Sequence, residues 1–446
     1  MDRLATKQSQ DSPILIAIVL GLLAATFLWP GYGEWKLAGV PNIAPPRLMK
    51  LLLLGWLAYR FAWSGLPVGR LRDRISTNLT IFVCLLTYEV FQVVAIALDP
   101  NWGYFFYAYI KEEIFSNLLL MFALLLVFRG EADLRRAVEV ISVSGLLIAL
   151  LVIVESILKQ NLFSKVVSDT NLGTAFAMLD KSRDLNYRAQ GPFSHPLLLA
   201  TFCAGALPLA WWSVSVTTGL RRGVHAMAIV GLLVAAYLSH TRSGQAVVLL
   251  VLTACVLREY VAWLRRCPNP VLAMLTLTIA VGLATVLAGV AGWYGWQILV
   301  GRTAEEAMSS HVRLEMLAAG VPKILESPLV GYGPTTGDAQ AGFSSRMFGG
   351  FVDDYFLALG LRVGLVGLIA YIGLYVAALW RTPKSWYERA PNALGFFLVV
   401  AIVGQMLMQI IHALSDLIGL LFALIAMTVV LGEQRRSHTA NLDDRV

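Results

Sequence analysis

Long apolar segments follow one another through almost the whole chain of 446 residues, and this pattern limits what the chain can fold into. An apolar helix needs about 20 residues to cross a bilayer, and many of these segments approach that length. Hydrophobic residues make up 58% of the sequence and charged residues only 14%. An average soluble domain carries about 25% charged residues. The segments are also too long for the alternating strands of a membrane barrel. The sequence therefore predicts an all-α, polytopic integral membrane protein.

Hydropathy and length give about twelve candidate membrane-spanning helices. In the first half they are Pro13–Trp29, Arg47–Trp63, Leu79–Leu98, Phe105–Phe128, Ala137–Leu158 and Pro196–Val216. In the second half they are Val224–Ser239, Gln245–Trp263, Val271–Trp293, Tyr355–Leu379, Ala393–Ile411 and Leu417–Leu431. The first segment lacks a clear small-residue cleavage site, so we interpret it as a retained helix rather than a signal peptide.

The basic residues predict the orientation of these helices. Arginines gather in the short loops of one side, which the positive-inside rule assigns to the cytoplasm, and both termini fall on that side. This arrangement predicts the following parts: residues 1–158 with helices 1–5, an external loop at 159–195, residues 196–293 with helices 6–9, a large external loop at 294–354, residues 355–432 with helices 10–12, and a cytoplasmic tail at 433–446. The two long external loops are where function is most expected.

No metal or disulfide framework is visible in the sequence. The cysteines Cys84, Cys203, Cys255 and Cys267 have no metal-like spacing. The adjacent pair Asp353 and Asp354 could ligate Mg²⁺, but further ligands are not evident. We therefore predict no metal and no cofactor.

Three cationic motifs stand at the external ends of predicted helices. Arg188 and His195 come just before the sixth helix; Arg188 suits an anion or an interfacial anchor equally, whereas His195 fits a helix start. Arg242 lies in a very short external loop, against the orientation bias, which favours a role for its planar fork in binding diphosphate. Arg313 lies on a predicted amphipathic helix at 310–324 in the large external loop.

The stretch from Gly349 to Leu368 combines Asp353 and Asp354 with Arg362, eight residues further along the predicted tenth helix. One aspartate suits a helix cap, but two beside an apolar run, with a buried arginine on the same face, are costly and suggest chemistry as well. Gln405, Gln409, His412 and Asp416 form a polar stripe that either links helices or lines the same external cavity. Glu89, Gln92, Lys111, Glu112 and Glu113 are further polar candidates.

Together these residues predict an external site for an anionic substrate that resides in the membrane. Arginines would hold a phosphate or diphosphate, and a carboxylate would act as a base.

Four motifs in order resemble the O-antigen ligase and O-antigen polymerase superfamily. They are "YRAQGPFSHPLLLATF", "HTRSGQAVVLL", "RLEMLAAGVPKILESPLVGYGPTTG" and "DDYFLALGLRVGLVGLIAY", and they cover roughly Tyr187 to Tyr371. The resemblance implies a bacterial inner-membrane, metal-independent and inverting glycosyltransferase with a GT-C-like helical fold. It also implies an undecaprenyl-diphosphate-linked glycan as donor, an acceptor glycan, and an active site facing the periplasm. Family arginines that hold the diphosphate match Arg188 and Arg242, and the loop arginine matches Arg313.

One difference between this chain and part of the superfamily bears on which of two reactions, ligation or polymerisation, it catalyses. Ligases that join O-antigen to the lipid A core carry a histidine where this chain has Asp353 and Asp354. The aspartates resemble the polymerases of O-antigen or exopolysaccharide, so we favour a polymerase over a ligase. The predicted catalytic residues are Asp353, Asp354 and Arg313, and the predicted substrate-binding residues are Arg188, Arg242, His195, Arg362 and His412. A chain-length regulator protein is a further conceivable partner; nucleic acid is not.

A flippase or other transporter is the main alternative from another class. It should place polar residues at the midplane and show repeated halves, whereas the informative charges here concentrate at one face. A plain scaffold would leave the external arginines unexplained.

Overall fold

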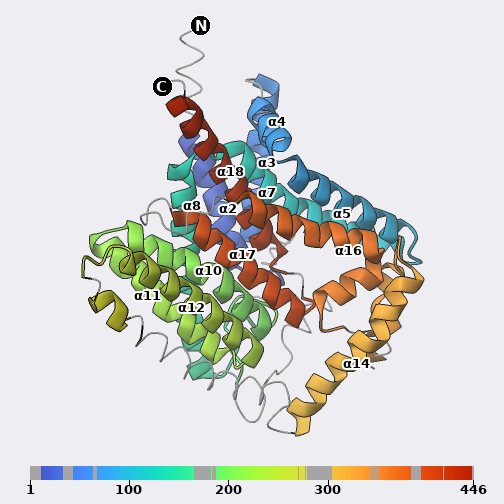
Figure 1. Cartoon of the computed structure of the whole chain (residues 1–446). Coiled ribbons are helices and arrows are strands. Elements are labelled where there is room, and N and C mark those ends of the chain that lie inside the picture. The colour runs from blue at the N-terminus through green and yellow to red at the C-terminus, as the bar shows by residue number, and fades with distance from the viewer. Residues whose placement is uncertain are drawn as a thin grey trace.

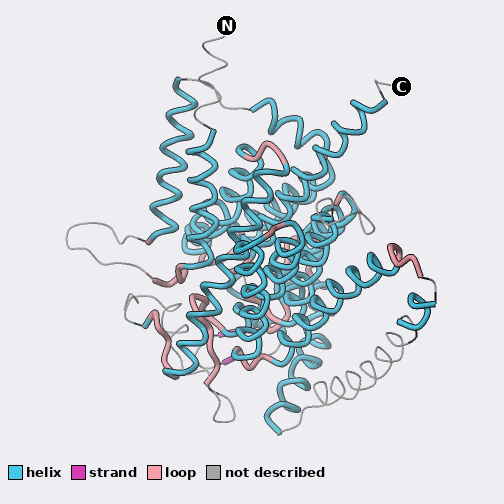
Figure 2. The backbone as a smooth tube through the Cα atoms, turned by 90° about the vertical axis from the view of Figure 1, so that its left-hand side faces the viewer, coloured by secondary structure: helices cyan, strands magenta, loops and turns pink. Residues whose placement is uncertain are grey.

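The computed structural model of the chain describes residues 12–33, 44–63, 68–164, 182, 187–269, 271–276, 278, 304–341, 344–345, 349–350, 352–382, 393–414 and 416–443. Helices account for nearly all of this part of the chain (Figure 2). In the first half they are α2 (Ser12–Leu28), α3 (Pro45–Trp63), α4 (Val68–Thr77), α5 (Leu79–Ala97), α6 (Trp102–Tyr109), the π-helix η1 (Ile110–Leu118), α7 (Leu119–Val127) and α8 (Glu131–Leu158).

In the second half the helices are α10 (Pro196–Val216), α11 (Gly219–Leu238), α12 (Arg242–Leu264), α14 (Ala304–Glu326), α15 (Gly333–Thr336), the 3₁₀-helix η3 (Asp338–Ala341), α16 (Tyr355–Arg381), α17 (Leu394–Ile411) and α18 (Ile418–Asp443). The strands β1 (Ser344–Ser345) and β2 (Gly349–Gly350) form one short antiparallel pair.

The prediction of a polytopic helical membrane protein is confirmed. Seven helices in the described residues are long and apolar enough to cross a membrane, namely α5, α8, α10, α11, α12, α16 and α17. Pro13–Leu28 and Ile418–Glu433 are shorter apolar helices. Of the predicted span Val271–Trp293 only 271–276 and 278 are described, and these are helical. The count of about twelve and the GT-C-like assignment stay predictions.

The predicted fourth span, Phe105–Phe128, is not one regular helix. It consists of α6, η1 and α7, with the π-helix at the polar stretch that contains Lys111, Glu112 and Glu113. A π-helix changes the register of the side chains and is frequent at functional sites. The extra residue per turn helps to turn Glu113 inward while Glu112 stays exposed.

The helix α10 is the centre of the bundle. It packs against α8, α11, α12 and α17, and almost every residue from Leu198 to Ala210 is buried (Figure 1). Small residues allow this close packing: a Cβ on Gly205 would lie 2.6 Å from Nε2 of Gln405 on α17. A helix that is apolar all round belongs in such a position. The N-terminus of α10 is therefore held firmly by its neighbours.

The helix α16 bends at Gly364, where the loop after α14 approaches it. Gly364 has φ 79° and ψ 179°, and the amide of Leu365 donates to the carbonyl of Pro328 at 2.6 Å. A Cβ on Gly364 would lie 2.7 Å from the same carbonyl oxygen, so the approach requires glycine there. Because α16 also packs closely against α5, the bend fixes the loop against both helices.

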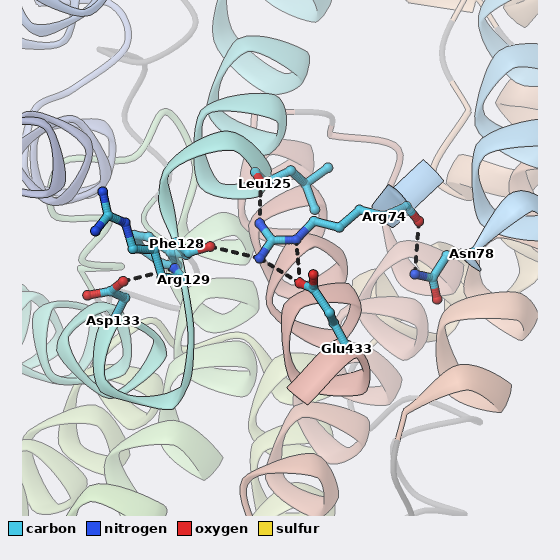
Figure 3. A network of polar contacts seen from close by, with 7 residues as sticks. All are labelled: Arg74, Asn78, Leu125, Phe128, Arg129, Asp133 and Glu433. Carbon is cyan, nitrogen blue, oxygen red and sulfur yellow. Dashed lines mark hydrogen bonds and ion pairs between the residues drawn. The ribbon is translucent and has the colours of Figure 1, made fainter. Parts of the chain in front are cut away.

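At the end of the bundle opposite α14, Arg74 on α4 joins distant parts of the chain (Figures 1 and 3). Its guanidinium is 1% exposed and donates to Glu433 on α18 at 2.7 Å, to the carbonyl of Phe128 at 2.8 Å and to that of Leu125. A buried arginine with several oxygen partners is well compensated. This network ties α4, α7 and α18 together.

Candidate active site

The helix α14 brings a cation to the start of α16. Nε of Arg313 donates to Oδ2 of Asp353 at 3.0 Å, and the two side chains are 39% and 23% exposed. The sequence predicted both residues for the site, and the structure brings them together across 40 positions of the chain. The partial exposure of both leaves the pair within reach of a ligand.

Asp354 is the N-cap of α16. Its Oδ1 accepts a hydrogen bond from the amide of Leu357 at 2.9 Å, as expected for a cap. Burial raises the pKa of Asp354, although backbone hydrogen bonds and Arg313 oppose that rise. The two adjacent aspartates thus have different surroundings: Asp353 binds a guanidinium, and Asp354 binds the helix start.

Arg362 binds the loop rather than the aspartate doublet. Its Nε and terminal nitrogen donate to the two carboxylate oxygens of Asp338 at 2.7 and 2.5 Å. This two-point contact is the strongest geometry available to an arginine and a carboxylate. The guanidinium of Arg362, predicted to bind substrate, therefore fixes η3 against α16.

A second contact fixes the same loop from the other side. Asp99, just after α5, accepts from the amide of Thr335 at 2.7 Å and from the hydroxyl of Thr335. Burial alone would raise the pKa of Asp99, but hydrogen bonds from Thr335 and Asn101 lower it overall. The turn at Gly333–Thr336 is thus held between α5 and α16, and with it the C-terminal end of α14.

The segment before α10 lies along the turn between α11 and α12. Nε of Arg188 donates to the carbonyl of Ser239 at 3.4 Å, and the amide of Ala189 donates to that of Leu238 at 3.2 Å. His240 has φ 46°, a left-handed conformation that residues other than glycine seldom adopt. Burial and the nearby Arg188 lower the pKa of His240. Arg242, the first residue of α12, belongs to this same turn.

A buried glutamate that the sequence reasoning missed holds this segment in place. Glu155 near the end of α8 is fully buried and accepts from Tyr187 Oη at 2.9 Å and from the amides of Gln190 and Gly191 at 3.0 and 2.7 Å. An acidic residue within an apolar run was the available signal. Its partners lie more than 30 positions away, so the sequence did not indicate them.

The two predicted histidines make capping contacts. Nδ1 of His195 accepts from the amide of Leu197 at 3.1 Å, which starts α10 as expected. Nδ1 of His412, after α17, accepts from the amide of Leu414 at 3.2 Å, so the proton is assigned to Nε2, 2.7 Å from the hydroxyl of Thr201. Burial and the positive charge of Arg313 lower the pKa of His412 to about 4.

The polar stripe mostly links helices. Nε2 of Gln405 donates to the carbonyl of Thr201 at 2.7 Å, and Oε1 of Gln409 accepts from Tyr371 and Tyr375 on α16 at 3.0 and 2.7 Å. Asp416 accepts from Ser194 at 2.5 Å, next to His195. The interhelical interpretation therefore applies to the glutamines, whereas Asp416 reaches the start of α10.

Two cationic groups flank the first turns of α10. On one side Gly244 of α12 lies so close to Ala200 of α10 that an added Cβ would be 2.4 Å from the alanine side chain. This contact places the turn between α11 and α12, with Arg242 and the neighbouring Arg188, beside α10. On the other side Thr201 contacts His412, whose pKa Arg313 influences. A helix N-terminus with neighbouring cations favours anions. The described residues contain no group of three potential metal ligands.

Residues 227–372 match the family model described as O-antigen ligase. The match begins within α11 and ends within α16, so it includes Arg242, Arg313, Asp353 and Asp354, whereas Arg188, His195 and His412 lie outside it. No curated protein matches the chain. The match and the apolar helices support a multi-pass bacterial membrane enzyme of the glycosyltransferase type that ligates or polymerises glycans. Over residues 227–372 the chain is similar to the O-antigen ligase family, and this similarity supports the O-antigen ligase and polymerase superfamily.

Proposed function

We propose that the protein polymerises O-antigen or exopolysaccharide repeat units. It transfers a glycan from undecaprenyl diphosphate to the hydroxyl of an acceptor sugar at the periplasmic face of the inner membrane. The observation that carries this proposal is the ion pair of Arg313 and Asp353, in which Arg313 is close enough to His412, a contact of Thr201 on α10, to lower its pKa. It combines a cation for a diphosphate with a carboxylate that can accept a proton.

In the proposed reaction Asp353 takes the proton from the acceptor hydroxyl while the oxygen attacks the anomeric carbon. The bond between that carbon and the diphosphate oxygen breaks, and the electron pair leaves with the diphosphate. A single displacement of this kind inverts the anomeric configuration. The guanidinium groups of Arg188, Arg242 and Arg313 stabilise the negative charge that develops on the leaving group. The diphosphate is already a good leaving group, so the reaction requires no metal.

In the absence of substrate, Asp353 forms an ion pair with Arg313. When the donor diphosphate arrives, it competes for the Arg313 guanidinium, which suits two oxygens of one phosphate. Asp353 is then released from Arg313 and can act as the base for the attacking hydroxyl. Asp354 keeps its capping hydrogen bond and holds the start of α16 in position.

The ligase reaction is the second candidate, because the matching family model is described as O-antigen ligase. The chemistry is the same, but the acceptor is lipid A core. The aspartate doublet, in the place where ligases carry histidine, favours the polymerase. A transporter of lipid-linked glycans is the candidate from another class, and buried Glu89 and Glu113 on α5 and η1 provide the polar interior that it would need.

Reconstitution separates the three candidates. The purified protein in liposomes receives an undecaprenyl-diphosphate-linked repeat unit, with or without lipid A core, and the products are resolved by electrophoresis. A ladder of products without the core supports the polymerase. Transfer only onto the core supports the ligase instead. Movement of the lipid-linked glycan between leaflets without any transfer contradicts an enzyme.

A further inference from the structure

Three cations that the proposed reaction does not use gather between α3 and η1. They are Arg47 and Lys50 in the first turns of α3 and Lys111 in η1. Nζ of Lys50 donates to the hydroxyl of Ser116 at 2.8 Å, and that hydroxyl donates to the carbonyl of Lys111 at 3.1 Å. Ser116 thus connects the Lys50 side chain to the turn that carries Lys111.

The surroundings of Lys50 are positively charged. The charged groups that act on its ammonium are Arg47 and Lys111. Within the part of the chain that the structure describes, neither Lys50 nor Lys111 forms an ion pair with a carboxylate. Like charges repel each other, and the half-buried Lys50 also loses hydration; both costs fall when an anion binds between the cations.

Lipid-facing side chains adjoin this cationic cluster. Leu48, Leu51 and Leu52 of α3 are exposed although they are large and apolar, and so is Phe115 of η1. In a membrane protein such a surface faces the acyl chains of lipids. Basic pockets between membrane helices can bind the phosphate headgroups of anionic lipids. The combination fits a phosphate group that carries a long apolar chain better than it fits a soluble phosphate.

The cluster lies next to the candidate active site without being part of it. Lys111 is followed by Glu112, which is close enough to Asp416 for their charges to interact. Asp416 contacts Ser194, the residue before His195 at the start of α10. The cationic cluster is therefore a neighbour of the site on the side of η1, whereas Arg188 lies in the segment before α10, Arg242 on α12 and Arg313 on α14.

We propose that Arg47, Lys50 and Lys111 bind the diphosphate headgroup of a second polyprenyl lipid, the one that carries the acceptor glycan. This inference rests on the proposed polymerase function, in which donor and acceptor are both linked to a lipid diphosphate. Two diphosphates must then be held at one time, and the arginines of the candidate active site serve the donor. A ligase has no need for the second polyprenyl site.

Binding stoichiometry tests the second site directly. The full-length protein in detergent is titrated with undecaprenyl diphosphate, and native mass spectrometry counts the lipids bound. We expect two lipids on the natural protein and one on the double variant Lys50→Gln, Lys111→Gln. One lipid is also expected on Arg242→Ala. The control Lys159→Gln, at an exposed lysine after α8, should bind two. Two lipids on the double variant would overturn the inference.

Competition experiments show which kind of phosphate-containing molecule the cationic cluster binds. Excess phosphatidylglycerol should leave both lipids in place, and so should inorganic diphosphate at equal concentration. If phosphatidylglycerol removes the lipid that depends on Lys50 and Lys111, the cluster is a general site for anionic lipids and the assignment to the acceptor is wrong. Displacement by inorganic diphosphate alone would equally contradict a site that recognises the lipid chain.

Kinetics separates this inference from the proposed function. Transfer is compared between a lipid-linked acceptor and a soluble acceptor oligosaccharide, as the ratio of the two kcat/KM values. We expect this ratio to fall about tenfold in the double variant, through a higher KM for the lipid-linked acceptor. An unchanged ratio in an active protein contradicts only the second site. Failure of the natural protein to transfer at all contradicts the proposed function, and the stoichiometry still decides on the second site.

Discussion

The helices α4 and α14 lie at opposite ends of the bundle (Figure 1). Each carries an arginine, Arg74 on α4 and Arg313 on α14, and the two side chains have opposite surroundings. The Arg74 side chain is 1% exposed and donates to a carboxylate and two carbonyl groups. The Arg313 side chain is 39% exposed, and its described contact is one carboxylate. The difference distinguishes two uses of the same side chain. An arginine enclosed by acceptors holds helices together, whereas one exposed arginine beside a carboxylate can exchange its partner for a ligand.

Among the variants that test this comparison of the two arginines, Arg313→Gln should have the largest effect. Glutamine keeps much of the length but lacks the charge that stabilises the leaving diphosphate. Transfer should fall about 10²–10³-fold, the usual cost of losing one such stabilising group. Rates are measured in liposomes with a lipid-linked repeat unit. The control Lys323→Gln lies on the same helix, where the exposed lysine pairs with Glu326, and it should transfer normally. Equal rates in the two variants would contradict the role of Arg313.

Arg74→Met should have the converse effect, on stability rather than on chemistry. It leaves Glu433 and the carbonyls of Leu125 and Phe128 without their donor. Loss of hydrogen bonds from a charged donor costs about 1.5–3 kcal/mol of folding free energy. Thermal unfolding in detergent should begin at a lower temperature, while the transfer rate per folded molecule stays normal. A loss of transfer rate in Arg74→Met as large as that in Arg313→Gln would contradict the distinction between a structural arginine, Arg74, and a substrate-binding one, Arg313.

Asp338→Asn tests whether the loop contacts position Arg313. It replaces the carboxylate that accepts from Arg362 at two oxygens by a neutral amide with a single accepting oxygen. Small displacements of reacting groups reduce rates steeply, and we expect transfer to fall about tenfold. The loss should appear in kcat with little change in KM. Thr335→Val removes one hydroxyl contact with Asp99 from the same loop and should have a smaller effect in the same direction. A normal kcat in Asp338→Asn would contradict this positioning role.

The smallest effect concerns pH. The pKa of His412 is about 4 in the folded protein, below its usual value of about 6.5. The unfolded chain therefore binds a proton that the folded protein does not, so stability falls as the pH decreases from about 6.5 to about 4. The midpoint of thermal unfolding should drop over this range, and less so in His412→Asn. Since Arg313 contributes to the lowered pKa, Arg313→Gln should shift the drop to higher pH. An identical pH profile in His412→Asn would contradict the assignment.

Features that depend on local sequence were predicted well. Pro196–Val216 was predicted with the bounds that α10 has, and Asp354 is the cap of α16 as its position beside an apolar run suggested. The apolar period and the Asp and Pro signals act over a few residues, so the sequence alone contains them. The superfamily was also recognisable, because its motifs are short and occur in a fixed order.

Features that depend on distant partners were not predicted. Arg362 pairs with Asp338, and Asp99 binds Thr335 across 236 positions. Nothing local distinguishes these residues from others beside a membrane. The π-helix η1 and the contact of Glu113 with Asn117, four positions along the chain, were missed for another reason: hydropathy does not report register.

The central claim is that Asp353, paired with Arg313, is the base of the transfer reaction, whereas Asp354 is a cap. Asparagine caps a helix as well as aspartate does, but it cannot accept the proton at neutral pH. The deciding measurement is the rate of glycan transfer by Asp353→Asn and Asp354→Asn in liposomes, with equal amounts of folded protein. We predict that Asp353→Asn loses about 10²–10⁴-fold in rate, as expected for a general base, and that Asp354→Asn keeps most of it. A rate close to normal in Asp353→Asn would contradict the account.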